Sequence, residues 1–330
     1  MAGSASVSER AKTAAIFYFP TDCVPLNKHI KDKMKKLTYI LIAIGMITAS
    51  CKGTTKKTQD DGLLLKQFEI TEVWRTDTLL MTPESVIYDK KRDIFYVSNM
   101  NFEPRKKDGN CFISRIDKNG NITDLRWIEG ISSPKGLAIV GDTLYTADVD
   151  EVVAIDITAG KIIRRMMIDG GKMLNDITSD PEGNLYFSDS DANRIYFYSK
   201  NKISVWYEEQ LNGPNGLLWD GERLLVASQG GMDFAAIDIR TKTRQLLTEG
   251  VNRGDGIAWT GIPGYYIVSD WEGEIFMINP DFTRSSLINT KSQKVNTADI
   301  EYVPDMNLLL VPTFFKNCIV AYKLTEKKEI

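Results

Sequence analysis

Histidine is almost absent from this chain of 330 residues: the only one is His29, which lies ahead of the part that carries any strand pattern. A catalytic base or a metal site built on histidine is therefore excluded from the folded region. The four cysteines do not cluster with the spacing of a zinc site. The formal net charge is −3 and the basic residues are dispersed, which argues against a nucleic-acid partner.

The sequence also lacks a long hydrophobic run. Its apolar stretch at residues 37–47 is too short for a comfortable transmembrane helix, but it has the length of a signal peptide. Met34-Lys35-Lys36 precedes the stretch and Thr48-Ala49-Ser50-Cys51 follows it, a pattern that resembles a bacterial lipoprotein signal. The alternative is a simple membrane anchor that ends in a chance cysteine.

These features predict the organisation of the N-terminal part. Residues 1–33 are expected to be an over-long gene start, and residues 34–51 a signal peptide that ends at lipidated Cys51. Residues 52–62, polar and rich in Thr and Lys, are expected to be a flexible tether. The protein would then be anchored by lipid in the bacterial cell envelope, facing the periplasm or the outer membrane.

The chain does contain one recurring sequence motif, a small turn followed by an apolar strand, which we call the phrase. It occurs six times: Pro83–Ile87, Pro134–Ala138, Leu174–Thr178, Pro214–Leu218, Gly254–Ala258 and Thr297–Glu301. The steps between equivalent positions are 51, 40, 40, 40 and 43 residues, with room for four short strands in each. Repeats of this length predict an all-β, six-bladed β-propeller over residues 63–330.

The ring is expected to be closed by the N-terminal strand. The sixth repeat ends one strand short, and residues 68–74 form a strand pattern ahead of the first repeat without belonging to it. Pairing the two would remove both free edges. Cys111 and Cys318 fall at equivalent places in the first and sixth blades, too far apart for a disulfide, so two free, buried thiols are expected.

One aligned position of the phrase places side chains around the central channel. Its residues in chain order are Glu84, Lys135, Asn175, Asn215, Asp255 and Ala298. Two carboxylates and two carboxamides from four blades form an all-oxygen set that suits one divalent cation, calcium above all. The competing interpretation is that Asn and Asp here only shape a turn before glycine.

The loops after each second strand should surround the same end of the channel. The longest, residues 100–110, contains Pro104 and Arg105 and is the expected lid or specificity loop. The last residues of the second strands include Asp148, Asp189 and Asp270. These are expected to cap the turns by accepting backbone hydrogen bonds.

The repeat pattern and the order Glu84, Asn175, Asn215, Asp255 resemble the senescence marker protein/gluconolactonase (regucalcin-like) family of six-bladed propellers, with diisopropylfluorophosphatase as a structural relative. The resemblance covers about residues 70–324 and implies one central divalent cation held by these four residues. It also implies that Asp255 is both a ligand and the catalytic base, and that Asn175 contacts the substrate.

Two departures from that family bear on specificity. Met173 stands where family lactonases usually carry arginine, with Lys172 adjacent, and blade two contributes Lys135 to the ring. The expected substrate-binding residues are therefore Asn175, Lys135, Lys172 and Asp299, with a small anionic or sugar-derived molecule as the substrate.

Three functions are compatible with this fold class. The first is a metal-dependent hydrolase of a lactone or related cyclic ester, in which the cation polarises the carbonyl. The second is a non-catalytic lipoprotein that resembles NHL-repeat propellers and binds a ligand or a protein. The third, a quinone-dependent sugar dehydrogenase, requires a histidine base and is disfavoured because the folded region has none.

Overall fold

The computed structural model describes residues 65–327, which belong to one compact unit spanning Leu63–Ile330. The predicted signal peptide, lipidated Cys51 and tether lie outside the described residues. Within the described range, no helix has the length and apolarity needed to cross a membrane.

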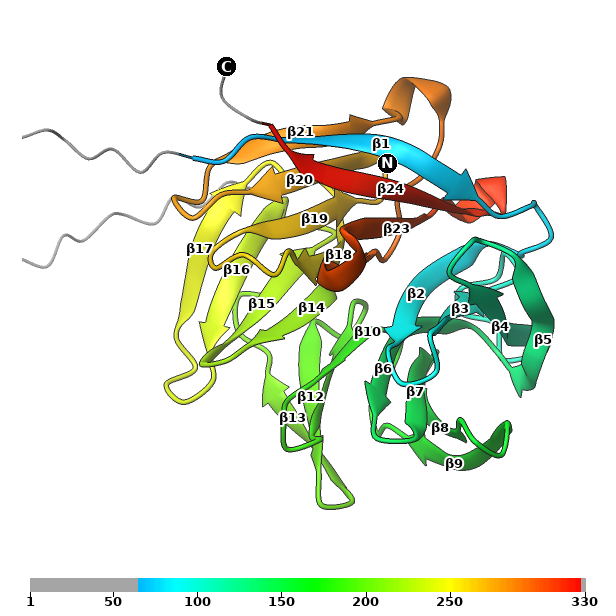
Figure 1. Ribbon diagram of the computed structural model, residues 1–330. Helices are drawn as coiled ribbons and strands as arrows, with labels where there is room; N and C mark the ends of the chain where they lie inside the picture. Colours follow the sequence, from blue (N-terminus) through cyan, green and yellow to red (C-terminus); the bar gives the residue numbers. More distant parts are fainter. Residues whose placement is uncertain (1–64, 328–330) are drawn as a thin grey trace, which may run out of the picture. The chain divides into compact units, whose positions relative to one another are not determined.

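The described chain folds into six four-stranded antiparallel sheets that surround a channel, as predicted (Figure 1). Blade one comprises β2 (Pro83–Asp89), β3 (Ile94–Asn99), β4 (Cys111–Asp117) and β5 (Ile122–Ile131); blade two β6 (Pro134–Val140), β7 (Thr143–Asp148), β8 (Glu151–Asp156) and β9 (Lys161–Met167); blade three β10 (Leu174–Ser179), β11 (Leu185–Asp189), β12 (Arg194–Ser199) and β13 (Lys202–Tyr207). Blade four comprises β14 (Pro214–Asp220), β15 (Arg223–Ser228), β16 (Asp233–Asp238) and β17 (Arg244–Glu249); blade five β18 (Gly254–Trp259), β19 (Tyr266–Asp270), β20 (Glu274–Ile278) and β21 (Arg284–Asn289).

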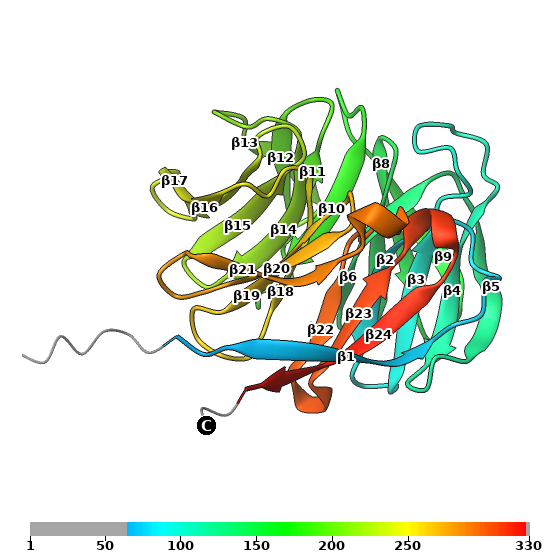
Figure 2. The same cartoon turned by 90° about the horizontal axis from the view of Figure 1, so that it is seen from above.

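Blade six is completed by the other end of the propeller. It contains β22 (Glu301–Val303), β23 (Leu308–Pro312), β24 (Ile319–Glu326) and, outermost, β1 (Phe68–Arg75). β1 pairs antiparallel with β24 from Phe68 opposite Glu326 to Arg75 opposite Val320. Figure 2 shows this pairing from above, and it confirms closure by the N-terminal strand.

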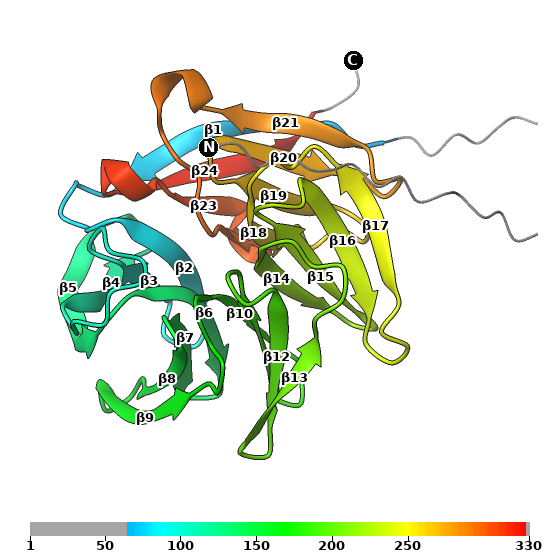
Figure 3. The same ribbon diagram turned by 180° about the vertical axis from the view of Figure 1, so that it is seen from behind.

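The core lies between the blades rather than inside them. Each interface between neighbouring blades holds its own cluster of buried apolar side chains; between blades two and three, for example, Ala147 and Met166 pack with Phe187 and Tyr196. The stability of the ring therefore depends on the contact of every blade with the next. Figure 3 shows the ring from behind. Cys111 and Cys318 are free and buried, as predicted.

The glycines of the repeated phrase are required for close approach between neighbouring inner strands. A Cβ atom built on Gly216 would lie 1.7 Å from the backbone oxygen of Asp255, and one on Gly136 would lie 2.4 Å from Oδ1 of Asp176. Neither glycine has a positive φ, so space and not backbone conformation selects the residue. Glycine at this position therefore shows that the neighbouring innermost strands lie too close together at the channel for a larger residue.

Candidate metal and ligand site at the channel mouth

In blades one to five, a β-bulge interrupts the alternation of the innermost strand at the start of the phrase, so two consecutive residues of the phrase lie next to the channel. In β2, for example, the register shifts between Pro83 and Val86. The first of the two residues, which we call the first ring, comprises Glu84, Lys135, Asn175, Asn215, Asp255 and Ala298. The second, which we call the second ring, comprises Ser85, Gly136, Asp176, Gly216, Gly256 and Asp299.

The first ring opens on a cavity of about 170 Å³, which we call the mouth cavity. Its lining residues are Glu84, Met100, Pro104, Arg105, Lys135, Met173, Asn175, Gln229, Arg253, Asp255, Trp271 and Phe314. The structure thus brings the ring and the loops after the second strands to the same end of the channel. Asn215 occupies the equivalent position of blade four, buried but outside this lining.

The four oxygen-bearing residues of the first ring share one property: each has a buried polar atom without a hydrogen-bond partner. These atoms are Glu84 Oε2, Asn175 Oδ1, Asn215 Nδ2 and Asp255 Oδ1, on residues that are at most 5% exposed. If the side-chain amide of Asn215 is turned by 180°, its oxygen takes the unpartnered position that Nδ2 holds here. Buried polar groups are normally satisfied, so four orphans in one ring indicate a place built for a ligand.

The carboxylates of the ring are held in an unfavourable environment. Burial raises the pKa of Glu84 well above its usual range, and repulsion from Asp255 and Asp299 raises it further. Burial and the charge of Asp299 likewise raise the pKa of Asp255, while Arg253 and the side-chain amide of Asn215 lower it. A bound cation would relieve both effects, because it offsets the desolvation of the negative charges.

Lys135 is buried in the same ring but forms no ion pair within the described residues. Its Nζ donates to the backbone oxygen and Oγ of Ser133, at 3.2 and 3.3 Å. Burial lowers the pKa of its ammonium group, while Glu84 and Asp148 raise it. The ammonium thus turns toward Ser133, and within residues 65–327 it makes no ion pair with Glu84 or Asp255.

The second ring is satisfied where the first is not. Asp176 accepts the backbone N–H groups of Ile177 at Oδ1 and of Leu217, in the next blade, at Oδ2, both at 2.6 Å. Asp299 accepts the hydroxyl of Ser85 at 2.5 Å, which joins blade six to blade one. These carboxylates connect neighbouring blades.

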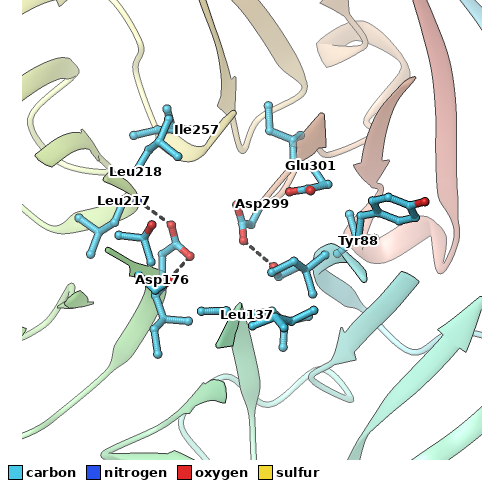
Figure 4. A pocket seen from close by; sticks show the side chains of 17 residues that line it. Tyr88, Leu137, Asp176, Leu217, Leu218, Ile257, Asp299 and Glu301 are labelled. Atoms are coloured by element: carbon cyan, nitrogen blue, oxygen red, sulfur yellow. Dashed lines mark hydrogen bonds between the residues drawn. The ribbon is translucent and has the colours of Figure 1, made fainter. Parts of the chain in front are cut away.

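A second cavity of about 300 Å³, which we call the far cavity, lies beyond the second ring. Figure 4 shows Asp176 and Asp299 facing the channel axis from opposite sides, with Glu301 next to Asp299. Asp299, predicted to bind substrate, therefore lines the far cavity and not the mouth. Lys172 is exposed and lines neither cavity, so the structure does not bring these two residues together with the first ring.

The loop of residues 100–110 crosses the mouth as expected. Arg105 pairs through Nε and Nη2 with the two carboxylate oxygens of Asp191, in blade three, at 2.8 and 3.0 Å. Lys107 donates to Asp150 of blade two at 2.9 Å. Both ion pairs are exposed, so each stabilises the loop only modestly.

Two of the Asp residues that end second strands cap the following turn as predicted: Asp189 accepts the backbone N–H of Ala192 at 2.8 Å, and Asp270 accepts that of Glu272 at 3.0 Å. Asp189 accepts the backbone N–H groups of Lys172 and Met173, at 2.8 and 3.1 Å, and Asp148 accepts those of Ser132 and Ser133. The carboxylates of Asp189 and Asp148 thus hold the segments that lead into the innermost strand of their own blade, and they are not free to bind a ligand.

Sequence reasoning missed an aromatic wall beside Ala298. Trp271 and Phe314 meet edge to face with ring centroids 5.4 Å apart, and Phe314 contacts Phe315 in the same way at 4.7 Å. Phe314 has a φ of 49°, unusual for a bulky residue. Both aromatic residues fall in loops predicted to surround the mouth, but nothing in the sequence showed that they pack together.

The donor set of the first ring fits a hard cation. Across residues 65–327, no group of three or more His, Cys, Asp or Glu side chains is arranged to hold a metal. A metal here would therefore depend on the carboxamides of Asn175 and Asn215 together with Glu84 and Asp255. Carboxylate and amide oxygens are the ligands that calcium takes in proteins.

Comparison with known proteins establishes the fold alone. No family model and no curated protein sequence matches the chain. Among solved structures, an inactive histidine variant of virginiamycin B lyase from Staphylococcus aureus with quinupristin covers 78% of this chain and 100% of its own (TM-score 0.56, 15% identity). A streptogramin B lyase covers 79% and 98% (0.57, 14%). An auxiliary nutrient-binding protein from Bacteroides thetaiotaomicron covers 78% and 77% (0.62, 12%).

Proposed function

We propose that the first ring binds one divalent cation, calcium, and that the mouth cavity hydrolyses a small lactone or related cyclic ester. The observation that carries this proposal is the set of four buried, unpartnered polar atoms on Glu84, Asn175, Asn215 and Asp255. A bound divalent cation would supply Lewis-acid polarisation of the ester carbonyl. The folded region has no histidine, so the base must be another residue.

Asp255 is the base in this scheme. Its unpartnered Oδ1 belongs to a residue that lines the mouth cavity, where a carboxylate can accept a proton from an attacking water. Asp255 takes a proton from the attacking water as the new C–O bond forms. The ring C–O bond then breaks, and the proton passes to the departing alkoxide to give a hydroxy acid.

The test is hydrolysis of a panel of lactones by the purified propeller, with calcium and with chelator. Asp255→Asn should abolish calcium-dependent hydrolysis while the variant remains folded. Asp220→Asn is the control, because Asp220 is bonded to Arg223 and Tyr266 and lines neither cavity of the channel. Equal hydrolysis by the wild type and Asp255→Asn would refute the role of Asp255.

A second candidate is a non-catalytic propeller that binds a small molecule. It is favoured by the likeness to the nutrient-binding protein and by Lys135, a cation that the expected lactonase ring does not contain. Calcium binding without hydrolysis of any lactone would favour this candidate.

We further propose that the chain is a lipoprotein anchored at Cys51 in the bacterial cell envelope. The support is the sequence Thr48-Ala49-Ser50-Cys51 after a short apolar run. Cys51→Ser should move the protein from the membrane fraction to the soluble fraction, and unchanged membrane association would contradict the proposal.

A further inference from the structure

Three basic side chains line the mouth cavity, and their charges are not equally available. Arg105 is matched by the two oxygens of Asp191, and Lys135 turns toward Ser133. Arg253 differs from both. Within the described residues, its guanidinium forms no hydrogen bond and no ion pair; it lies over the ring of Trp271, 4.8 Å from the centroid.

Arg253 also stands where two cavities meet. Beside the mouth cavity is a space of about 490 Å³, which we call the vestibule, formed over the loops of blades three and four. The two cavities share only Arg105, Met173, Gln229 and Arg253. A molecule that enters the mouth cavity from the vestibule passes this arginine.

The stacking on Trp271 holds the guanidinium in place without using its donors. A guanidinium presents a planar fork of N–H groups that matches the two oxygens of a carboxylate or a phosphate. Arg253 lines the same cavity as Glu84 and Asp255 of the first ring, and its donors remain available there.

We infer that the molecule bound at the channel mouth carries an oxyanion, a carboxylate or a phosphate, and that Arg253 is the residue that recognises it. This inference rests on the proposed function and names its substrate class: an oxyanion joined to an apolar or ring-shaped body. The body packs against Trp271 and Phe314, which line the mouth cavity beside Arg253. Lys135 and Arg253 both line the mouth cavity, so they present positive charge to an anion that enters it.

The experiment compares matched probes that differ only in charge: phenylacetate with phenylacetamide, and phenyl phosphate as a third arm. Binding is measured by ligand-observed NMR on the wild type, Arg253→Met, Arg253→Lys and Arg284→Met. Arg284→Met is the matched control, because Arg284 also stacks at 4.8 Å on an aromatic ring of blade five, Phe276, yet lines neither cavity. Methionine keeps an apolar stem over Trp271 while removing the charge.

We expect the wild type and Arg284→Met to prefer phenylacetate to phenylacetamide by about tenfold, the usual effect of one charge-assisted contact. Arg253→Met should lose the preference and Arg253→Lys should restore part of it. Preference for phenyl phosphate over phenylacetate would identify the oxyanion as a phosphate, and the reverse would identify a carboxylate. No acid preference in the wild type, a preference retained in Arg253→Met, or an equal loss in Arg284→Met would overturn the inference.

Calcium calorimetry on the same samples separates this inference from the proposed function. Arg253→Met should bind calcium as the wild type does, because Arg253 supplies no oxygen ligand. Acid recognition without calcium binding would refute the cation site and leave the role of Arg253 standing. Calcium binding without acid preference would refute the role of Arg253 alone.

Discussion

The first and second rings are built from adjacent residues of the same strands, yet they have opposite relations to their hydrogen-bonding partners. Asn175 carries an unpartnered buried oxygen, whereas the carboxylate oxygens of Asp176 both accept backbone N–H groups. Both residues are buried. Burial alone therefore does not distinguish a residue that binds ligand from one that joins blades; the distinction lies in whether the protein itself satisfies the polar group.

The largest expected effect is loss of stability from the second ring. Asp176→Ala removes the acceptor of the Ile177 and Leu217 N–H groups and leaves two buried donors unpaired. We expect the free energy of unfolding to fall by about 3 kcal/mol. Urea unfolding in the presence of chelator measures this, and a change below about 1 kcal/mol would show that Asp176 does not join blades three and four.

A smaller, pH-dependent effect is expected at the far cavity. Burial, with repulsion from Asp299, raises the pKa of Glu301 to about 8, so the folded state holds its proton more tightly than the unfolded state. Stability is then lost as pH rises from the ordinary range of glutamate through about 8. Glu301→Gln should therefore raise stability at pH 9 and change it little at pH 4.

Thermal unfolding of the wild type and Glu301→Gln across this range gives the comparison. A gain for Glu301→Gln that is equal at both pH values would mean that the charge of Glu301 is not what costs stability.

The smallest effect on stability is expected from the neighbour of Asp176. Asn175→Ala loses one neutral hydrogen bond, from Nδ2 to Oγ of Ser190 at 3.0 Å, and removes an oxygen that had no partner. Without calcium the free energy of unfolding should fall by less than about 1 kcal/mol. With calcium the melting temperature should rise less than that of the wild type, because one ligand is missing.

Melting curves with calcium and with chelator separate the two contributions. The comparison between the rings would fail if Asn175→Ala were as destabilising as Asp176→Ala in chelator, or if its calcium-induced shift matched that of the wild type.

The blade count, the closing strand and the first ring could be predicted from the sequence, because each is recorded in a repeat of fixed length. The second ring could not be separated from the first. Strand alternation would place only one of Asn175 and Asp176 toward the channel, and the bulge that turns both inward has no sequence signature of its own. The sequence therefore did not show that Asp299 lines the far cavity instead of the mouth cavity.

The wall of the mouth was also beyond prediction. Trp271 and Phe314 follow the second strands of blades five and six, and Arg253 directly precedes the first strand of blade five. The repeat therefore places them near the mouth but does not show that they pack together. Their contact depends on loop conformation, including the positive φ of Phe314. Loop residues of this kind carry specificity, while the repeated strands carry the scaffold.

Titration calorimetry with calcium tests the central claim most directly. The wild type should bind one calcium ion, Glu84→Gln and Asp255→Asn should each lose most of the affinity, and Asp299→Asn should retain it, since Asp299 belongs to the second ring. No heat of binding in the wild type, or a loss in Asp299→Asn equal to that in Asp255→Asn, would contradict the assignment of the first ring as the cation site.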